Sequence, residues 1–181
     1  FHCLYAKLYK ITGTLSRFLE EFDRTFRAEK RRLCLCEYSD METYACRALY
    51  DGDEPSELAL SLRERYEAVY IDEYQDVNRL QNRIFAAVSR PDNRFTVGDI
   101  KQSIYGFRSA DPSIFAGMKA SFPPYPGTAD VPEVSLFMAD NFRCDRVVVD
   151  FVNAVFDRLF SLTGESIGYV DADRLRFAKK Y

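Results

Sequence analysis

The chain has 181 residues, of which 47% are hydrophobic, so it can bury one good core and a smaller satellite. Its formal net charge of -3 excludes a surface that is basic throughout, so any contact with nucleic acid must be local. One histidine, His2, argues against a histidine-activated nucleophile, and no apolar run approaches the roughly 20 residues of a membrane span. Five cysteines without CxxC spacing indicate reduced thiols, and we expect a cytoplasmic location without membrane contact.

The first third of the chain is predicted to be helical. Residues 14–33 carry apolar side chains at spacings of three and four, which is typical of an amphipathic helix. Further helices are predicted over residues 40–49 and 55–66, the latter with Pro55 in its first turn. Because the chain opens inside an apolar helical pattern and does not begin with Met, we interpret it as an internal fragment of a longer protein.

A basic cluster lies within the first predicted helix and comprises Arg24, Arg27, Lys30, Arg31 and Arg32. Glutamates are interspersed with these cations. We therefore interpret the cluster as a solvated helix face rather than a nucleic-acid site.

From residue 68 onward, short apolar runs alternate with helical patterns, which predicts an α/β fold with a parallel sheet. The predicted strands span residues 68–71, 95–97 and 134–138. Asn78 and Gln81 have the spacing of a capping box at the start of a helix, Asp111-Pro112 starts another, and a last helix covers residues 145–160.

Two adjacent carboxylates, Asp72 and Glu73, follow the first predicted strand directly. Ligands of open α/β sheets bind beyond the carboxyl ends of the strands, and carboxylates there can hold hydrated magnesium. Asp72 is predicted to bind the metal, and Glu73 to orient or deprotonate an attacking water. The alternative is that both are solvated loop residues before the next helix.

The second predicted strand also ends in an acidic residue, Asp99, and Gln102 follows closely. Because the carboxyl ends of parallel strands share one edge, we expect Asp72, Glu73, Asp99 and Gln102 to converge on one crevice. This convergence indicates a nucleotide-driven motor.

Aromatic and cationic side chains follow this second strand at Tyr105, Phe107 and Arg108. Flat rings beside a cation suit stacking on exposed bases, although such rings taken alone are more often core packing. Arg143, at the mouth of the last helix, has the charge and planar geometry to meet a phosphate, or else forms a surface ion pair.

Three ordered segments resemble motifs of the UvrD/Rep superfamily of DNA helicases. Residues 71–76 resemble its Walker B motif, residues 97–105 its third motif and residues 141–143 its fourth. Details of residues 37–42 and 101–115 resemble the AddA subunit of the AddAB helicase-nuclease, with RecB as the nearest competitor. The resemblance covers nearly the whole chain from about residue 15 onward.

This resemblance implies a partial RecA-like P-loop NTPase motor that uses ATP and Mg²⁺. Asp72 would bind the metal, Glu73 would be the catalytic base, and Gln102 would sense the γ-phosphate. Arg143 would be an arginine finger at the junction with a second motor domain.

The resemblance also implies contact with DNA and a second subunit. Tyr105, Phe107 and Arg108 would bind single-stranded DNA, and an AddB-like partner would complete a helicase-exonuclease that processes double-strand break ends for recombinational repair. Residues 1–66 would end a helical accessory domain, residues 67–141 would form the motor core, and residues 142–181 would begin the second motor domain.

The sequence departs from the family in one severe respect, since nothing matches the phosphate loop GxxxxGK(S/T). The alternative is therefore a non-catalytic DNA-binding or scaffolding module derived from a motor. A metal-dependent nuclease site at Asp72, Glu73 and Asp76 is disfavoured, because nuclease carboxylates usually come from several strands.

Overall fold

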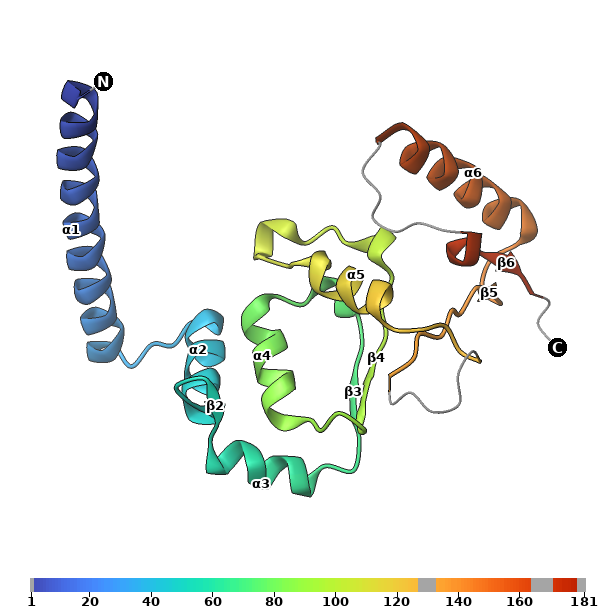
Figure 1. Cartoon of the computed structure of the whole chain (residues 1–181), viewed down its shortest axis with the longest axis horizontal. Helices are drawn as coiled ribbons and strands as arrows, with labels where there is room; N and C mark the ends of the chain where they lie inside the picture. Colours follow the sequence, from blue (N-terminus) through green and yellow to red (C-terminus); the bar gives the residue numbers. More distant parts are fainter. Residues whose placement is uncertain (1, 127–132, 164–170, 179–181) are drawn as a thin grey trace. The chain divides into compact units, whose positions relative to one another are not determined.

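The computed structural model describes residues 2–126, 133–163 and 171–178, apart from a few side chains near the element ends. The chain divides into two compact units, residues 1–45 and 46–181, which we describe separately. Figure 1 shows the order of their elements along the chain.

The first unit consists of α1 (His2–Arg32) and the start of α2 (Tyr38–Leu49). Helix α1 begins well before the predicted residue 14. Gly13 costs a helix about 1 kcal/mol relative to alanine, but the helical pattern on both sides of it carries the helix through. The apolar side chains of α1 are exposed, Phe18 to 64% and Phe22 to 57%.

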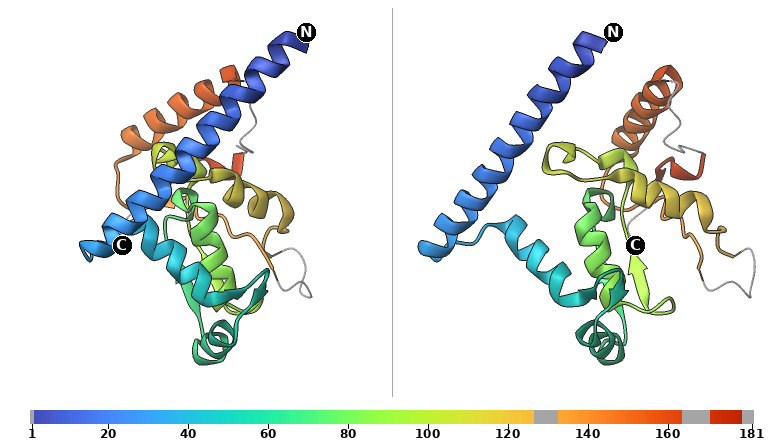
Figure 2. Two further views of the ribbon diagram at one scale, coloured as in Figure 1. Left: turned by 90° about the vertical axis from the view of Figure 1, so that its left-hand side faces the viewer. Right: turned by 60° about the vertical axis from the view of Figure 1, so that its left-hand side comes forward.

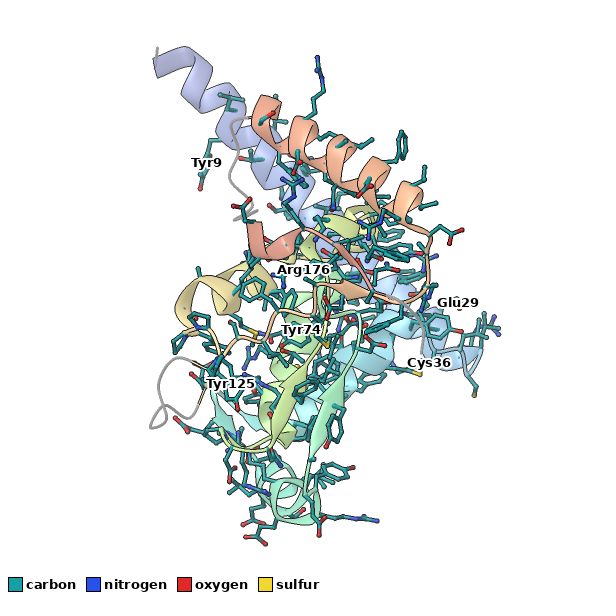
Figure 3. The ribbon with its side chains drawn as sticks, turned by 90° about the vertical axis from the view of Figure 1, so that its right-hand side faces the viewer. Tyr9, Glu29, Cys36, Tyr74, Tyr125 and Arg176 are labelled. Carbon is teal, nitrogen blue, oxygen red and sulfur yellow. The ribbon has the colours of Figure 1, made fainter. Side chains whose placement is uncertain are left out.

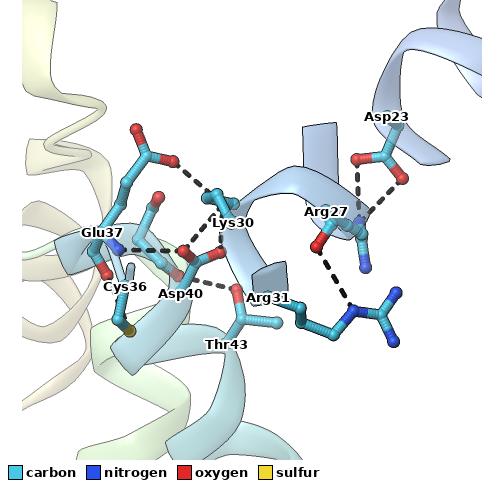
Figure 4. Close-up of polar contacts among 9 residues, drawn as sticks. Asp23, Arg27, Lys30, Arg31, Cys36, Glu37, Asp40 and Thr43 are labelled. Carbon is cyan, nitrogen blue, oxygen red and sulfur yellow. Dashed lines mark hydrogen bonds and ion pairs between the residues drawn. The ribbon is translucent and has the colours of Figure 1, made fainter. Parts of the chain in front are cut away.

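Lys30 connects the end of α1 to the start of α2 (Figure 4). Its ammonium nitrogen lies 2.7 Å from the Asp40 carboxylate and 3.0 Å from that of Glu37. The Asp40 carboxylate also accepts a hydrogen bond from the Glu37 backbone N–H at 2.9 Å. One acidic residue thus satisfies the first turn of α2 and pairs with α1.

The second unit opens with a hairpin that the sequence analysis did not predict. Strands β1 (Tyr50–Asp51) and β2 (Glu54–Pro55) pair antiparallel around a turn in which Gly52 has φ of 67°. Helix α3 (Glu57–Arg65) follows, with the Ser56 hydroxyl accepting from the Ala59 N–H. The helix is confirmed, but placing Pro55 in its first turn was wrong, because Pro55 lies in β2 and Ser56 is the cap.

A parallel pair of strands, β3 (Val69–Ile71) and β4 (Arg94–Thr96), lies at the centre of the second unit. Helix α4 (Arg79–Val88) connects them and begins with the predicted capping box of Asn78 and Gln81. Figures 1 and 2 show α4 beside the strand pair. This is the predicted arrangement of strand, helix and parallel strand.

The core beneath the strand ends is built around Tyr74, which is labelled in Figure 3 and fully buried. Its ring contacts those of Phe85 and Phe115, and its hydroxyl donates to the Asn82 Oδ1 at 2.5 Å. The short helix η1 (Tyr74–Asp76) contains Tyr74 and packs against α5 (Pro112–Ser121). This packing fixes the backbone that follows β3. A second cluster joins α2, α3 and α4 through Leu49, Ala59 and Ala87.

The predicted strand over residues 134–138 is wrong. Within the described part of the chain this segment makes a single β-bridge, between Pro124 and Ser135, and most of its side chains are exposed. An apolar run becomes a strand only where another strand offers its hydrogen-bonding edge.

The remaining pairing joins β5 (Asp140–Asn141) to β6 (Arg176–Phe177), again in parallel. Helix α6 (Arg146–Thr163) follows β5 close to its predicted bounds, and the short helix η4 (Asp171–Asp173) precedes β6. The predicted α/β class with small parallel pairs is confirmed. No helix among the described residues has the length and apolar character to cross a membrane.

Candidate nucleotide and DNA site

The two carboxylates after β3 lie on the surface, as the strand-end argument expects. The Asp72 Oδ1 accepts the Glu73 backbone N–H at 2.8 Å, and both side chains are exposed. Glu73 has φ of 50° and ψ of 41°, the left-handed conformation, which a residue with a Cβ rarely adopts. This conformation turns the chain sharply from β3 into η1.

Gln75 joins this segment to the end of β4. Its Nε2 donates to the Glu73 Oε2 at 2.7 Å and lies 3.3 Å from the Asp76 Oδ2, while its Oε1 accepts the Asp99 N–H at 2.9 Å. The side chain is 1% exposed. The backbone also ties the strand ends, because the Tyr74 N–H donates to the Val97 carbonyl at 2.8 Å.

Asp99 is the centre of the polar cluster after β4. The Lys101 ammonium lies 2.9 Å from its Oδ1, and the Gln102 Nε2 donates to its Oδ2 at 3.1 Å. Burial favours the neutral form of Asp99, but the bonds from Lys101 and Gln102 outweigh burial and hold its pKa below the usual carboxyl value. Asp99 is therefore an anion at neutral pH.

Three of the four residues predicted to converge are thus linked by hydrogen bonds, since Glu73 reaches Asp99 through Gln75, and Asp99 reaches Gln102. Asp72 adjoins this cluster through the chain. A cavity of about 560 Å³ borders Asp99 and Lys101 on the β4 side, but neither Asp72 nor Glu73 lines it. These two carboxylates are reached from solvent.

The donor set fits a magnesium ion that is held largely by its substrate. Among the described residues no cluster of three or more His, Cys, Asp or Glu side chains could hold a metal. Magnesium bound to a nucleotide needs only one or two protein carboxylates, because phosphate and water oxygens complete its octahedron. One oxygen of Asp72 accepts the Glu73 N–H, and no described residue bonds the other.

The predicted aromatic cluster is compact and exposed. Rings of Tyr105 and Phe107 lie 5.9 Å apart at 53°, and the Arg108 guanidinium lies 5.3 Å and 5.6 Å from their respective centroids. Phe107 is 79% exposed and Tyr105 38% exposed. The alternative of core packing is therefore wrong for Phe107. Both rings and the cation belong to or adjoin η3 (Gly106–Arg108).

Arg143 lies in the turn between β5 and α6. The Asn141 Oδ1 accepts its backbone N–H at 2.9 Å and that of Cys144 at 2.9 Å. Its side chain is exposed, and no described residue forms an ion pair or hydrogen bond with its guanidinium. The structure does not join Arg143 to the carboxylates.

Sequence reasoning gave no role to Gln75 or Lys101, the two residues that organise this cluster. Lys101 entered only through the resemblance to AddA. The available signal for Gln75 was its place between two strand ends that were expected to meet, but its bond to Asp99 spans 24 residues and depends on tertiary structure.

Comparison with known protein families identifies residues 5–123 as matching the UvrD/REP helicase N-terminal domain. The chain is also 37% identical to a protein from Clostridium acetobutylicum that is named as the AddA-type subunit of an ATP-dependent helicase/nuclease. This match covers 98% of the present chain and 15% of that protein.

Two further relatives carry the same name. The one from Moorella thermoacetica is 41% identical over 86% of this chain and 12% of its own length, and the one from Desulfitobacterium hafniense is 36% identical over 97% and 13%. The chain spans about one-seventh of the length of these relatives. Since the matched domain covers well over half of the chain, the predicted membership is confirmed: this chain belongs to the UvrD/REP helicase family.

Proposed function

We propose that this chain supplies the magnesium-binding and coupling part of the ATP hydrolysis site in an AddA-like helicase-nuclease. The observation that carries the proposal is the hydrogen-bonded connection from Glu73 through Gln75 to Asp99 and Gln102. It joins the ends of two parallel strands, where open α/β sheets bind nucleotides. In this proposal residues 67–141 belong to a RecA-like motor core.

The exposed carboxylates have distinct roles in the proposed reaction. Asp72 holds magnesium through the oxygen that no described residue bonds, and the ion neutralises charge on the phosphates of ATP. Glu73 accepts a proton from the attacking water. Gln102 contacts the γ-phosphate and, through its bond to Asp99, couples it to the segment that follows β4.

Arg143 acts as an arginine finger from the start of a second motor domain at residues 142–181. Its guanidinium is exposed and has no described partner, so it is available to an anion. Residues 1–66 belong to an accessory domain in this scheme.

Tyr105, Phe107 and Arg108 bind single-stranded DNA in this proposal. Exposed rings beside a guanidinium suit bases of any sequence, as a translocating enzyme requires. By analogy with the names of the relatives, the full-length protein is an ATP-dependent cytoplasmic enzyme that works with an AddB-like partner on double-strand break ends.

The experiment that tests this function is Glu73→Gln in the full-length protein. Losing the base should reduce the kcat of DNA-stimulated ATP hydrolysis by about 10²- to 10⁴-fold, with nucleotide binding retained because the change is nearly isosteric. Exposed Glu64 on α3 offers the matched control, and Glu64→Gln should hydrolyse ATP at the normal rate. Normal hydrolysis by Glu73→Gln would refute the assignment.

A further inference from the structure

Gln75 is a buried amide whose two ends bond different strand ends. Its Nε2 reaches the Glu73 carboxylate at 2.7 Å, and its Oε1 accepts the Asp99 N–H at 2.9 Å. The Gln75 backbone carbonyl also accepts from the Ser103 hydroxyl at 3.5 Å. A side chain that is 1% exposed, with both amide atoms bonded, has a single orientation available to it.

The Glu73 carboxylate depends on this amide. In the described structure, the bond from Gln75 is the only hydrogen bond that its side chain accepts. An exposed glutamate without such a bond samples several rotamers, and fixing it costs conformational entropy. Since Glu73 also leaves β3 in the left-handed conformation, one amide decides where its carboxylate points.

The end of β4 leaves room for this amide. A Cβ placed on Gly98 would lie 2.6 Å from the Gln75 Oε1 and 3.1 Å from the Gln75 N. No other residue type fits there without displacing Gln75. The amide, Gly98 and the Asp99 N–H therefore form one fitted contact between the strand ends.

We infer that Gln75 is a positioning residue for ATP hydrolysis, which orients the Glu73 carboxylate and sets it in register with Asp99 and Gln102. The inference rests on the proposed role of Glu73 as the base. Gln75 faces away from solvent and acts through Glu73 rather than on the nucleotide. A shift of the β4 end reaches Glu73 through this amide.

The test is Gln75→Glu in the full-length protein. This change keeps an oxygen for the Asp99 N–H and replaces the donor to Glu73 by a like charge. Misdirecting the base should lower kcat by about 10- to 100-fold. KM for ATP and Kd for single-stranded DNA should stay within about threefold, because no binding group is removed.

The swapped variant Glu73→Gln with Gln75→Glu gives a readout that is independent of hydrolysis. It restores an amide-carboxylate pair in the reverse direction, so the melting temperature lost in Gln75→Glu should be recovered while hydrolysis stays lost. No recovery of the melting temperature would show that the 2.7 Å contact does not hold the two residues together, and would overturn the inference.

Asn93 provides the matched control. It is another buried amide, 8% exposed, at the opposite end of β4, where it donates to the Tyr66 carbonyl and accepts the Arg90 N–H. Asn93→Leu should lower the melting temperature without changing kcat per folded molecule. If Gln75→Glu instead kept a normal kcat while Glu73→Gln abolished hydrolysis, the inference would fail and the proposed function would stand. Hydrolysis by Glu73→Gln would refute the function itself.

Discussion

At the scale of single residues, the candidate site depends on an unfavourable backbone conformation. Glu73 is one of three non-glycine residues described with positive φ, together with Cys34 and Ser109. The left-handed conformation costs a residue with a Cβ about 1–2 kcal/mol, and the packing of Tyr74 and the bonds of Gln75 hold it in place. Strain of this kind is frequent at functional sites.

The exposed ring of Phe107 gives a prediction about DNA. If it stacks on a base, Phe107→Ala should weaken single-stranded DNA binding by about 1–3 kcal/mol, with no change in the salt dependence. Arg108→Ala should weaken binding and also reduce the salt slope by about 1, because a phosphate contact is lost. Fluorescence anisotropy over a salt series measures both quantities.

Tyr38 serves as the control for this measurement, since it is 85% exposed at the start of α2. Tyr38→Ala should leave DNA affinity unchanged. Equal affinity of the Phe107→Ala variant and the parent protein would remove Phe107 from the DNA site.

At the scale of elements, the helix between the two central strands is fixed by its start. Asn78 accepts the Gln81 N–H at 2.8 Å, and the Gln81 side chain accepts the Asn78 N–H at 3.1 Å. This capping box determines where α4 begins and so where Asn82 meets the Tyr74 hydroxyl.

Removal of this cap should destabilise the second unit. Asn78→Ala is expected to lower the free energy of unfolding by about 1 kcal/mol, whereas Asn78→Asp should retain most of it, since aspartate caps helices as well. Chemical denaturation monitored by circular dichroism compares the three proteins. An unchanged midpoint for Asn78→Ala would show that packing alone fixes this helix.

The junction of α1 and α2 should depend on pH. The hydrogen bond from Lys30 lowers the pKa of Asp40, and the bond to Asp40 raises the pKa of Lys30. The contribution of Asp40 is complete above the usual carboxyl pKa of about 3.9 and is lost as pH falls through its lowered value. The contribution of Lys30 is complete below about 10.4 and is lost as pH rises through its raised value.

Hydrogen exchange of residues 30–45 measures this dependence. We expect protection to be constant at intermediate pH after correction for the intrinsic exchange rate, and to fall on strong acidification. In Asp40→Asn, protection should be lower at neutral pH and should lose its acid-dependent step. A step that persists in Asp40→Asn would assign the effect to another carboxylate, such as Glu37.

At the scale of the whole molecule, the 181-residue chain should not hydrolyse ATP by itself. Its sequence has no GxxxxGK(S/T) loop, whose backbone amides and lysine hold the phosphates of a nucleotide. Steady-state hydrolysis with saturating single-stranded DNA is the measurement, and full-length protein is the positive control. DNA-stimulated turnover by the chain alone would overturn the view of an incomplete site.

The sequence by itself determined the local elements and the types of chemistry. Apolar periodicity located most helices, the spacing of Asn78 and Gln81 gave a cap, and carboxylates after apolar runs marked the strand ends. These features depend on neighbours within a few residues. The hairpin of β1 and β2 was missed because its strands have two residues each, too few for an alternating pattern.

Only the tertiary structure decided which of these residues act together. The Gln75 side chain bonds Asp99, 24 residues away, because α4 returns the chain to pair β4 with β3. Residues 134–138 have the composition of a strand but make only one bridge, since strand formation requires a partner edge. Chemical identity is a local property of the chain, whereas the contacts that orient a carboxylate depend on segments that meet only after folding.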